Sequence, residues 1–576
     1  MEIAAFAFDY DGTLARDGRV AETTVAALRR LKAAGPLLLL ITGRQLPDLQ
    51  RTFSHWSMFD AIVAENGAVL LRPSHHEELS LAPSPPAALL EALRQRQVDP
   101  LSVGRSIIAT WQPNETKVLA AIRDCGLEWQ IIFNKGAVMC LPPGVNKASG
   151  LRAALESLGL SPLNVVGVGD AENDHAILLA CGYRVAVGNA IDLLKSEADY
   201  VCHAHHGAGV EELIQRFLAV PPQDLTSGVR RYDLGIGGDL DGPVAIPSSA
   251  ALLIAGSSGG GKSRLATLLI ERIAEKEMQL CVVDPEAEYG AMLSLASLGG
   301  ASKAPSLEEV GQLLEHPHNN LVINLLAVDL ESRPKYVAGL ITLLKKLKTR
   351  FARPHWLIID EAHHGIPRAS QPGSAMGPSS LRGAALITAA PLELPPAILR
   401  AIDVAIFLGE GARERFEACR DALGTAGIPP GKTRLEPNQA LYWCRNAHQI
   451  RIVELDAPRQ EHERHVRKYA QGVLGEDNSF YFRGEHNQLN LRAYNLITFV
   501  QLAKGVDAGT WLFHLQRGDY SRWFREVIKD EQLAEHAASL EHSQSTDATA
   551  SRQAICDLVE ARYTAPADAP LQPRGT

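Results

Sequence analysis

The chain has 576 residues, 46% of them hydrophobic and 21% charged, which is typical of a globular protein with several hydrophobic cores. Its formal net charge of −9 excludes a polycation that coats nucleic acid over its whole surface, while a local basic groove is still allowed. The longest aliphatic run, Leu37–Ile41, is far shorter than the roughly 20 residues of a membrane helix, and the eight cysteines include no CxxC pair. We therefore expect a cytoplasmic, multi-domain protein with reduced cysteines, no signal peptide and no membrane contact.

The first 218 residues alternate short apolar stretches, typical of buried strands, with amphipathic stretches typical of helices. The expected strands are Ile3–Phe8, Leu37–Ile41, Ala61–Ala64, Val165–Val168 and Arg184–Val187, and the expected helices include Glu22–Ala34 and Lys147–Leu158. This alternation indicates a parallel sheet with crossover helices. We assign residues 1–70 and 147–218 to this α/β core and residues 71–146, with helices and strands of their own, to an inserted α+β cap.

A second strand–helix alternation occupies residues 243–455, after a Gly- and Asp-rich stretch at 219–242 that we interpret as a linker. Its expected strands are Ala251–Ala255, Gln279–Val283, Leu321–Leu325, His355–Ile359, Ala384–Thr388 and Val404–Leu408. Residues 456–564 predict a small helical module, with helices around Leu491–Leu502, Thr510–Leu515 and Ser521–Ala537. The Pro- and Ala-rich tail, 565–576, is expected to be disordered. The expected fold class is thus multi-domain α/β with a helical C-terminal module.

Four short polar segments in the first domain each lie at a predicted strand end or helix start. They are Asp9-Tyr10-Asp11-Gly12-Thr13, Thr42-Gly43-Arg44, Lys147 after a Pro-Pro-Gly turn, and Gly169-Asp170-Ala171-Glu172-Asn173-Asp174. Ligands of open α/β sheets bind at the carboxyl edge of the strands, so these segments are expected to converge there. The oxygen-rich last segment suits a hard cation such as Mg²⁺.

This ordered set resembles the haloacid dehalogenase (HAD) superfamily over residues 1 to about 218. The match is closest to the Cof-like, type IIB phosphatases, since Glu65-Asn66-Gly67-Ala68 and Val187-Gly188-Asn189-Ala190 also stand where that branch has them. The resemblance implies a Rossmann-like core with a cap and a Mg²⁺-dependent phosphatase. The short cap resembles those of phosphatases acting on small phosphates such as phosphoglycolate or phosphosugars, which implies a small phosphorylated metabolite as substrate.

The resemblance also implies a role for each matched residue. Asp9 would attack phosphorus to form an aspartyl-phosphate, and Asp11 would protonate the leaving oxygen and later activate water. Thr42 and Lys147 would hold the transferring phosphoryl group. The implied Mg²⁺ ligands are Asp9, Asp170, Asp174 and the Asp11 carbonyl, with Asn173 supporting that shell.

A nucleotide-binding loop lies in the second domain, where residues 256–263 fit the pattern GxxxxGK[ST] between a predicted strand and a predicted helix. The matched residues are Gly256, Gly259, Gly260, Gly261, Lys262 and Ser263. Lys262 would reach the β- and γ-phosphates of ATP, and the Ser263 hydroxyl would ligate Mg²⁺. The apolar strand that ends in Asp360-Glu361 supplies the partner acids: Asp360 would meet Mg²⁺ through water, and Glu361 would polarise the attacking water. We therefore predict ATP binding and hydrolysis.

The second domain resembles HerA/FtsK-type ATPases over about residues 240–455, chiefly through Asp284-Pro285-Glu286-Ala287-Glu288-Tyr289 and the layout of the later strands. The resemblance implies a homo-oligomeric ring and a motor. One departure counts against motor activity, because Ala389-Ala390 follow the sensor-strand Thr where that family often has Gln or His. Asp-Glu-Ala-His also suggests a superfamily 2 helicase, but the other motifs of that class are not evident.

Several basic clusters have two interpretations each. Residues 345–353 would face DNA or supply an arginine finger in a ring, but a solvated helix face explains them better. Arg400 and Arg413 are equally good finger candidates. The basic stretch at 462–468 and the aromatic- and Arg-containing stretch at 511–524 would suit an anion or stacked bases, although a solvated face and a helical core are the favoured interpretations.

Three functional hypotheses follow. The first is a phosphatase of a small metabolite that an ATP-binding domain regulates or assembles. The second is a HerA-like nucleic-acid translocase with an accessory phosphatase that trims a nucleic-acid end or removes a nucleotide signal. The third is a nucleotide-gated scaffold whose C-terminal module recruits a partner. The net negative charge and Ala389-Ala390 favour the metabolite phosphatase. The segment Asp284–Tyr289 favours the translocase.

Overall fold

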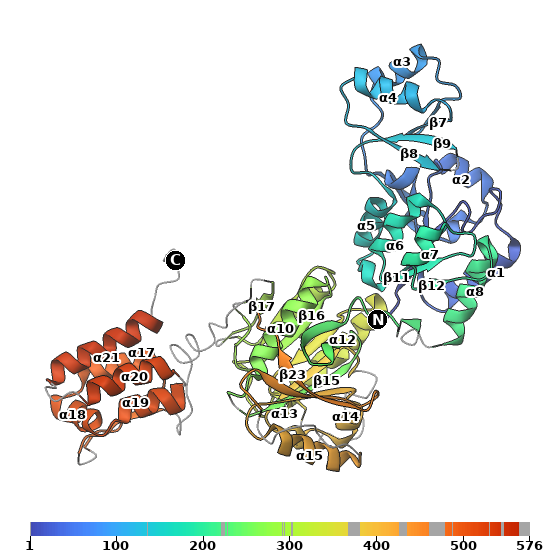
Figure 1. Cartoon of the computed structure of the whole chain (residues 1–576). Coiled ribbons are helices and arrows are strands. Elements are labelled where there is room, and N and C mark those ends of the chain that lie inside the picture. Colours follow the sequence, from blue (N-terminus) through green and yellow to red (C-terminus); the bar gives the residue numbers. More distant parts are fainter. Residues whose placement is uncertain are drawn as a thin grey trace. The chain divides into compact units, whose positions relative to one another are not determined.

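The computed structural model describes residues 2–563 apart from 135, 221–224, 227, 258, 291, 293, 301–302, 367–380, 426–434, 460–478, 486–487, 529 and 543–546. The predicted tail at 565–576, the basic stretch at 462–468, Ser258 and part of the predicted linker lie outside the described residues. The chain divides into two compact units, Met1–Ala457 and Pro458–Thr576 (Figure 1). Among the described residues, no helix is both long and apolar enough to cross a membrane.

The N-terminal region is built on a mixed sheet that is parallel from β12 to β3 and antiparallel from β3 to β5. In spatial order its strands are β12 (Tyr200–Val201), β11 (Tyr183–Ala186), β10 (Val165–Gly169), β1 (Ala5–Asp9), β2 (Leu37–Ile41), β3 (Ala61–Ala64), β4 (Val69–Arg72) and β5 (Glu77–Ser80). Its helices are α1 (Glu22–Ala33), α2 (Leu46–Thr52), α5 (Lys147–Ser157), α6 (His175–Ala180), α7 (Asp192–Glu197) and α8 (His206–Ala219).

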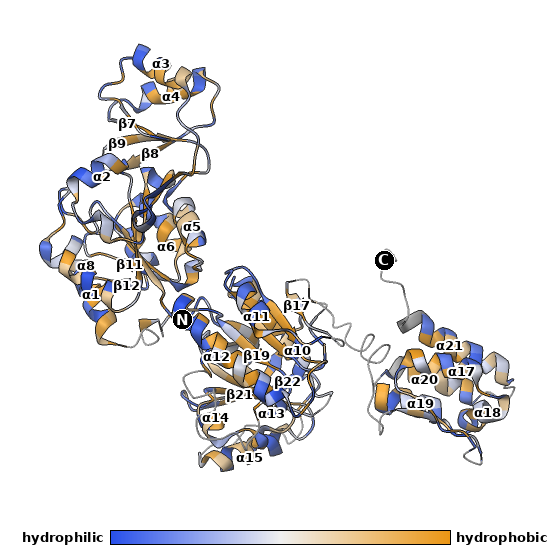
Figure 2. Cartoon of the chain, turned by 180° about the vertical axis from the view of Figure 1, so that it is seen from behind, coloured by the Kyte–Doolittle hydropathy of each residue, from blue (hydrophilic) through white to orange (hydrophobic). Residues whose placement is uncertain are grey.

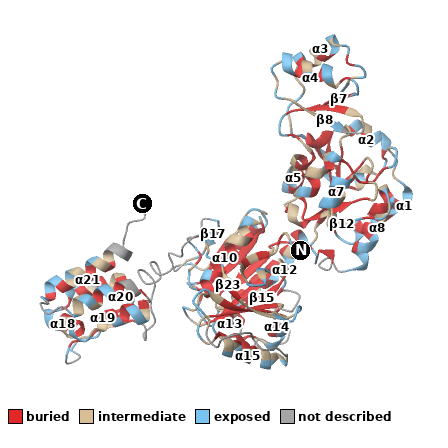
Figure 3. Ribbon diagram, viewed as in Figure 1, coloured by how far each residue is buried: buried red, intermediate tan, exposed pale blue. Residues whose placement is uncertain are grey.

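The central parallel strands of this sheet are buried on both faces, as expected for parallel strands connected by helices. Strand β1 is buried along its whole length, and the interior of this region is largely buried (Figure 3). Phe6 and Phe8 pack into one apolar cluster with residues of α1 and α8, while Ala5 and Ala7 pack into another with residues of α5. The helices carry hydrophilic as well as hydrophobic residues (Figure 2), because each one covers the sheet with a single side. The predicted α/β core is confirmed.

The cap is a separate α+β layer (Figure 1). Its elements are α3 (Ala87–Gln95), α4 (Glu115–Asp124), β6 (Ser102–Val103), β7 (Ile108–Trp111), β8 (Gln130–Asn134) and β9 (Ala137–Leu141), with the strands in the order β6-β7-β9-β8. Residues of β9 alternate in direction: Val138 and Cys140 pack with the two helices, whereas Met139 and Leu141 join the core of the main sheet. The hairpin β4–β5 belongs to the main sheet, although the sequence assigned residues from 71 onward to the cap.

A second large sheet, mostly parallel, forms the rest of the first unit. Its strands are, in order, β14 (Gly242–Ile246), β13 (Leu234–Asp239), β23 (Gln449–Leu455), β22 (Gln439–Cys444), β21 (Val404–Leu408), β15 (Ala251–Gly256), β20 (Ala384–Thr388), β19 (Trp356–Ile359), β16 (Leu280–Asp284), β18 (Leu321–Asn324) and β17 (Ala296–Leu298). Its helices are α10 (Lys262–Glu275), α11 (Leu307–Leu314), α12 (Arg333–Phe351), α13 (Ala362–Gly365), α14 (Pro396–Arg400) and α15 (Ala412–Leu423).

Part of the predicted linker at 219–242 is in fact a strand of this sheet. Leu234–Asp239 forms β13, which pairs with both β14 and β23. Leu234 and Ile236 are fully buried, so the period-2 alternation of a strand is present. Glycines and Asp239 fill the remaining positions of the pattern, and a stretch rich in Gly and Asp is typical of a linker.

Hydrogen bonds join the two α/β regions at the amino ends of β10 and β19. The Asn164 side chain, just before β10, donates to the Ala352 carbonyl (3.2 Å) and accepts from His355 Nε2 (3.0 Å), just before β19. The buried Arg353 guanidinium donates to the Gly159 carbonyl (2.6 Å). Since the predicted active-site acids follow the carboxyl ends of these strands, the junction lies at the opposite ends from both predicted sites.

His355 makes the stability of this junction pH-dependent. Burial, with the charges of Arg353 and Lys348, lowers its pKa from 6.5 to about 3. The unfolded chain therefore binds a proton that the folded chain excludes, so stability is full above pH 6.5 and falls as the pH drops toward 3. We expect a loss of about 2 kcal/mol between pH 7 and pH 5 from this group.

Thermal unfolding at pH 7 and pH 5 measures this effect. The variant His355→Gln should lose less stability on acidification than the unmodified chain, whereas His318→Gln, at an exposed position, should behave like the unmodified chain. An equal acid-induced loss in His355→Gln and the unmodified chain would show that His355 does not contribute.

The C-terminal unit combines one small hairpin with helices around an aromatic core. Its elements are β24 (Phe480–Phe482), β25 (Leu491–Ala493), α17 (Leu496–Gly505), α18 (Ala508–Gln516), α19 (Asp519–Trp523), the π-helical turn η9 (Phe524–Ile528), α20 (Glu531–Glu541) and α21 (Ala548–Tyr563). The rings of Trp511 and Tyr520 stack at 4.4 Å between centroids. The predicted helical module is confirmed.

One predicted helix of this unit begins too early. Residues 491–493 pair with β24 as a strand, and the helix starts only after Asn495. The Asn495 side chain accepts a hydrogen bond from the Thr498 backbone N–H (2.8 Å) and so caps the helix. Asn495 therefore marks the boundary between strand β25 and helix α17. Because apolar residues occur on both sides of it, the hydrophobic pattern alone does not reveal this boundary.

Candidate active sites

The first candidate site lies at the carboxyl end of β1, where a lysine bridges two carboxylates. Lys147 Nζ lies 2.6 Å from Asp9 Oδ1 and 2.6 Å from Asp174 Oδ1, and all three side chains are almost fully buried. Lys147 is the first residue of α5. Its position there is fixed because the Asn146 side chain caps that helix, accepting from the Ser149 N–H (2.9 Å).

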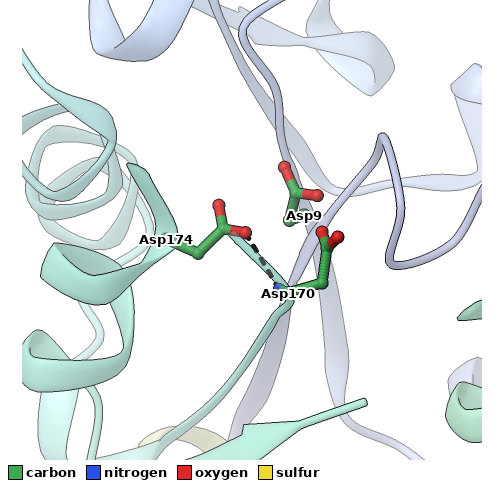
Figure 4. Close-up of side chains that lie close together, drawn as sticks. All are labelled: Asp9, Asp170 and Asp174. Carbon is green, nitrogen blue, oxygen red and sulfur yellow. Dashed lines mark hydrogen bonds between the residues drawn. The ribbon is translucent and has the colours of Figure 1, made fainter. Parts of the chain in front are cut away.

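Three carboxylates gather next to this lysine (Figure 4). Asp9, Asp170 and Asp174 each offer an oxygen within 4.8 Å of the others, and all three residues are buried. The loop after β10 holds them in place, since Asp174 Oδ2 accepts from the backbone N–H groups of Asp170 and Ala171 at 3.0 Å each. Thr13 donates to Asp170 Oδ1 (3.1 Å), which ties this loop to the one after β1.

Crowding of negative charge in a buried place changes the proton affinity of the nucleophile candidate. Burial, together with the nearby Asp174 carboxylate, raises the pKa of the Asp9 carboxyl from 3.8 to about 8, although Lys147 opposes the rise. A single lysine therefore does not compensate the three carboxylates. A divalent cation would, because it favours the ionised form of every carboxylate around it.

Asn173 gives a second indication that the site suits a cation. Its side-chain oxygen and nitrogen are buried and have no hydrogen-bond partner among the described residues. Buried polar groups are nearly always paired, so this amide lacks a partner that a hydrated metal ion would supply. The oxygen-only donor set of Asp9, Asp170 and Asp174 fits Mg²⁺.

Asp11, the predicted acid and base, is held by a residue that the sequence prediction left out of the site. Arg44 binds the Asp11 carboxylate with two hydrogen bonds, Nε to Oδ2 at 2.7 Å and Nη2 to Oδ1 at 2.8 Å. Its Nη1 donates to Asp48 Oδ2 (2.8 Å), which fixes the guanidinium itself. Thr42, two residues before Arg44, is buried at the end of β2, and its hydroxyl accepts from the Arg44 N–H (3.1 Å).

This bidentate pair predicts that Arg44 positions Asp11. Arg44→Met should lower the kcat of the phosphatase by roughly 100-fold with a smaller change in KM, because a misplaced catalytic group costs about that much. Steady-state kinetics on an aryl phosphate would measure both constants. Arg51→Met is the matched control, since Arg51 contacts Asp48 at 3.5 Å and is mostly exposed. An unchanged kcat in Arg44→Met would contradict this role.

Other residues that the predicted site omitted fasten the loops around it. The Gly12 carbonyl accepts from Asn189 Nδ2 (2.9 Å) and from His206 Nδ1 (2.7 Å). Glu65, buried after β3, accepts from the backbone N–H groups of cap residues Arg105 and Ser106 at 3.0 Å each. Glu65 and Asn189 lie in motifs that the sequence comparison had already matched, Glu65-Asn66-Gly67-Ala68 and Val187-Gly188-Asn189-Ala190. Nothing in the sequence pointed to His206.

The second candidate site is the loop between β15 and α10. Gly256 ends β15, while Gly259 and Gly261 have φ angles of +76° and +95°, which only glycine adopts without strain. Lys262 and Ser263 are buried at the first turn of α10, with Lys262 Nζ donating to the Ser257 carbonyl (3.2 Å). Gly260 lies in the same loop, its N–H donating to the Ser257 carbonyl (3.0 Å). This geometry is that of a phosphate cradle at a helix N-terminus.

Acidic residues that follow β16 and β19 lie near this cradle. The Ser263 hydroxyl donates to Glu288 (3.3 Å), and Tyr289 donates to Asp360 (2.9 Å). Burial, with Glu288 and Glu361 nearby, raises the pKa of Asp360 from 3.8 to about 7. Buried Asp360 and half-buried Glu288, beside a hydroxyl, suit a hydrated Mg²⁺, which would favour their ionised forms.

A histidine contacts Thr388, the residue before Ala389-Ala390, where the second domain departs from the HerA/FtsK pattern. Thr388, at the end of β20, forms a hydrogen bond between its hydroxyl and His363 Nδ1 (3.0 Å), and His363 also lies 3.5 Å from Glu361. Strand β20 lies between β15 and β19, so this pair is placed between the cradle and the acids. A polar side chain therefore does contact Thr388. It is His363 of α13, and it does not come from position 389 or 390.

Comparisons with known proteins find relatives of both α/β regions. A family model for haloacid dehalogenase-like hydrolases matches residues 6–117 and 123–214. A phosphoglycolate phosphatase from Methanothermobacter thermautotrophicus is 35% identical over 221 residues, which are 37% of this chain and 98% of that protein. The chain belongs to the haloacid dehalogenase-like hydrolases.

Further relatives extend the comparison. A phosphoglycolate phosphatase from Methanobrevibacter smithii is 28% identical over 233 residues, 38% of this chain and 100% of that protein. Among solved structures, a haloacid dehalogenase-like hydrolase from Bacteroides thetaiotaomicron is 21% identical and covers 37% of this chain and 99% of its own, with a TM-score of 0.33. A model described as the central domain of helicase HerA matches residues 248–349. The predicted resemblances to both families are confirmed, the second over these residues.

Proposed function

We propose that this chain is a Mg²⁺-dependent phosphatase of a small phosphorylated metabolite, of the phosphoglycolate or phosphosugar class, with an ATPase domain that regulates or assembles it. The buried cluster of Asp9, Lys147, Asp170 and Asp174 supports this most strongly. Folding such a set into one place costs stability, because desolvated charges must be paired. The cluster therefore suits a function in which a phosphate and a cation complete the charge balance.

In the proposed reaction Asp9 Oδ attacks phosphorus, forming an O–P bond while the bond from phosphorus to the ester oxygen breaks. Asp11 gives its proton to the departing oxygen, which leaves as an alcohol. Water then attacks the phosphorus of the aspartyl-phosphate, the bond between phosphorus and the Asp9 oxygen breaks, and Asp11 takes a proton from that water. Inorganic phosphate is released, and both carboxyl groups return to their starting states. Arg44 keeps Asp11 oriented in both steps.

Lys147 and Thr42 would hold the phosphoryl oxygens, and Asp9, Asp170, Asp174 and the Asp11 carbonyl would hold the cation, supported by Asn173. Bound Mg²⁺ would supply the positive charge that lets a carboxylate approach a phosphate dianion. Lys147 adds a fixed positive charge, because Asp174 and Asp9 outweigh its burial and raise its pKa. It therefore stays protonated throughout the pH range of the reaction.

A small substrate is favoured by the way the cap meets the core. Glu65 fastens the cap turn at Arg105 and Ser106 to the core, and Met139 of β9 accepts a hydrogen bond from Asn66 (2.8 Å). The Asn66 N–H also donates to the Thr42 carbonyl (3.1 Å), so the cap is fastened to a segment that contacts the predicted site. A cap held beside the site favours a compact ester. Two similar proteins are named phosphoglycolate phosphatases, which points to the same class.

In the second domain the loop residues Gly256, Gly259, Gly260, Gly261, Lys262 and Ser263 would hold the phosphates of ATP. Asp360 would bind Mg²⁺ through water together with Ser263, and Glu361 would polarise the attacking water. Because the two α/β regions share a buried junction at Asn164 and His355, nucleotide binding at one would reach the other through β19 and β10. This connection supports regulation more than two independent activities.

A substrate panel tests the proposed activity. Purified full-length protein with Mg²⁺ would be incubated with small phosphate monoesters, including phosphoglycolate and phosphosugars, with and without ATP. We expect hydrolysis of a small ester, absent in EDTA and changed in rate by ATP. Turnover that ATP leaves unchanged would contradict regulation, and no turnover of any ester with Mg²⁺ would contradict the phosphatase.

The match to the HerA central domain over residues 248–349 favours a second candidate function, a nucleic-acid translocase that forms a ring and carries an accessory phosphatase. Its test is ATP turnover in the presence of DNA. A translocase requires turnover that DNA stimulates and that falls steeply with salt, since phosphate contacts release counterions. Basal turnover that DNA does not change would count against it and for regulation.

A further inference from the structure

A cavity of about 410 Å³ opens on the C-terminal unit between β24, α18 and α19. Its wall contains three arginines, Arg483, Arg517 and Arg522, and the aromatic residues Tyr481, Phe513 and Trp523. Pockets for small molecules span roughly 300–1,000 Å³, so this cavity is large enough for one small ligand and too small for a folded partner. Neither proposed activity uses any residue of this unit.

The arginines are arranged as prepared anion donors. Arg483 lies over the ring of Tyr481 (5.0 Å to the centroid) and Arg517 over that of Phe513 (5.1 Å). Stacking covers the face of a guanidinium and leaves its edge, with the N–H groups, open to a ligand. Arg517 and Arg522 each lie within 3.5 Å of Asp519, so one carboxylate holds two guanidiniums side by side.

A partly buried network keeps this arrangement in place. His514 is only 5% exposed; its Nε2 accepts from the Arg483 backbone N–H (3.1 Å), so Nδ1 carries the proton and donates to Asp519 (2.9 Å). The network links the end of β24 to α18 and α19. Polar groups are costly to bury, and the aromatic core of this unit is complete without them. They are therefore best explained by the pocket that they shape.

The charges of the pocket point to more than a bare anion. Three guanidiniums outnumber the carboxylates of Asp519 and Glu526, which favours an oxyanion such as phosphate. Asp519 is occupied with its arginines, while Glu526 is exposed on the same wall. A carboxylate there would repel inorganic phosphate but would accept hydrogen bonds from sugar hydroxyls or an amino group. Flat rings and guanidiniums along the wall suit a planar base.

We propose that this pocket binds a free nucleotide, with its phosphate on Arg517, Arg522 and Arg483, its base against the aromatic wall and a hydroxyl or amino group on Glu526. A free nucleotide fits better than a nucleic-acid strand. Residues 458–576 contain 16 Asp and Glu against 14 Lys and Arg, whereas strand-binding surfaces are basic. The proposal does not depend on either activity of the first unit.

Calorimetric titration of the full-length protein tests this proposal. The Lys262→Ala background removes nucleotide binding at the P-loop, and EDTA removes metal-dependent binding at the first site. Adenosine 5′-monophosphate should bind one to one, and adenosine or inorganic phosphate at least about 10-fold more weakly, because each makes only part of the contacts. Arg517→Ala and Arg522→Ala should each weaken nucleotide binding at least about 10-fold, since each loses a charge-assisted contact.

Arg525→Ala is the matched control, because Arg525 is exposed on η9 and does not line the pocket. Arg517 and Arg522 are themselves 61% and 55% exposed, so their variants should keep the thermal midpoint of the parent protein. The proposal is overturned by absence of saturable nucleotide binding, by equal weakening in Arg525→Ala, or by phosphate binding as tightly as the nucleotide. Tighter binding of a 12-nucleotide single strand would also overturn it in favour of a strand.

Discussion

Replacing Asp9 with asparagine is expected to abolish Mg²⁺-dependent hydrolysis of phosphate monoesters while ATP hydrolysis continues. Asn keeps the size of the side chain but removes the nucleophilic oxygen and one negative charge from the cluster with Asp170 and Asp174. Loss of a covalent nucleophile typically costs at least about 10⁴-fold in turnover, so the remaining rate should fall to the background of the assay. Initial rates with an aryl phosphate and with ATP, on the same preparation, measure both activities.

The control for this substitution is Asp17→Asn, which removes a carboxylate from the same segment at a fully solvated position. It should hydrolyse both substrates at the normal rate. Aryl phosphate hydrolysis by Asp9→Asn above one hundredth of the normal rate would refute Asp9 as the nucleophile. Loss of ATP hydrolysis as well would indicate that the two sites depend on each other.

Lys262→Ala should remove ATP binding and lower ATP hydrolysis by at least about 100-fold, because the fixed charge on the transferring phosphates is lost. The side chain is buried in the loop and touches the Ser257 carbonyl, so the substitution removes a charge without opening the hydrophobic core. Basal phosphatase turnover without ATP should not change, since Asp9 and Lys147 lie on β1 and α5, in the other α/β region. Nucleotide binding by fluorescence and both turnover assays provide the measurements.

Lys335→Ala, at an exposed position of α12 in the same domain, serves as the control and should bind ATP normally. If Lys262→Ala still hydrolyses ATP at the normal rate, the loop is not the nucleotide site. If it loses basal phosphatase activity while keeping its thermal midpoint, the second domain is required for the first activity and does more than regulate it. A normal basal rate that no longer responds to ATP would support regulation through the junction at His355.

The sequence predicted the parts of both sites that depend on strand order. Asp9, Thr42 and Asp170 each lie at the carboxyl end of a strand, and parallel strands bring such residues to one edge whatever the details of packing. The loop at 256–263 was equally predictable, because glycines with positive φ and a helix start define it locally. Residue order along the chain was sufficient for these features.

Contacts between side chains from distant elements were not predictable in the same way. The Arg44–Asp11 pair depends on how two loops face each other, and the sequence showed only a short Thr-Gly-Arg turn. His363 reaches Thr388 because β20 lies beside β19, which no local pattern reveals. The pocket of the C-terminal unit joins residues of β24 to those of α19. The sequence allowed stacked bases at 511–524, but its helical pattern favoured a core, and no local pattern brings β24 to this helix.

The most direct test of the central claim is to look for the phosphoryl group on Asp9. The protein would be mixed with Mg²⁺ and a hydrolysed ester, quenched in acid within the first turnover, digested and analysed by mass spectrometry. The account predicts a phosphorylated peptide whose modified residue is Asp9, formed at least as fast as steady-state turnover and absent from Asp9→Asn. A phosphoryl group on another residue, or burst-free turnover with Asp9 unmodified at every time point, would contradict it.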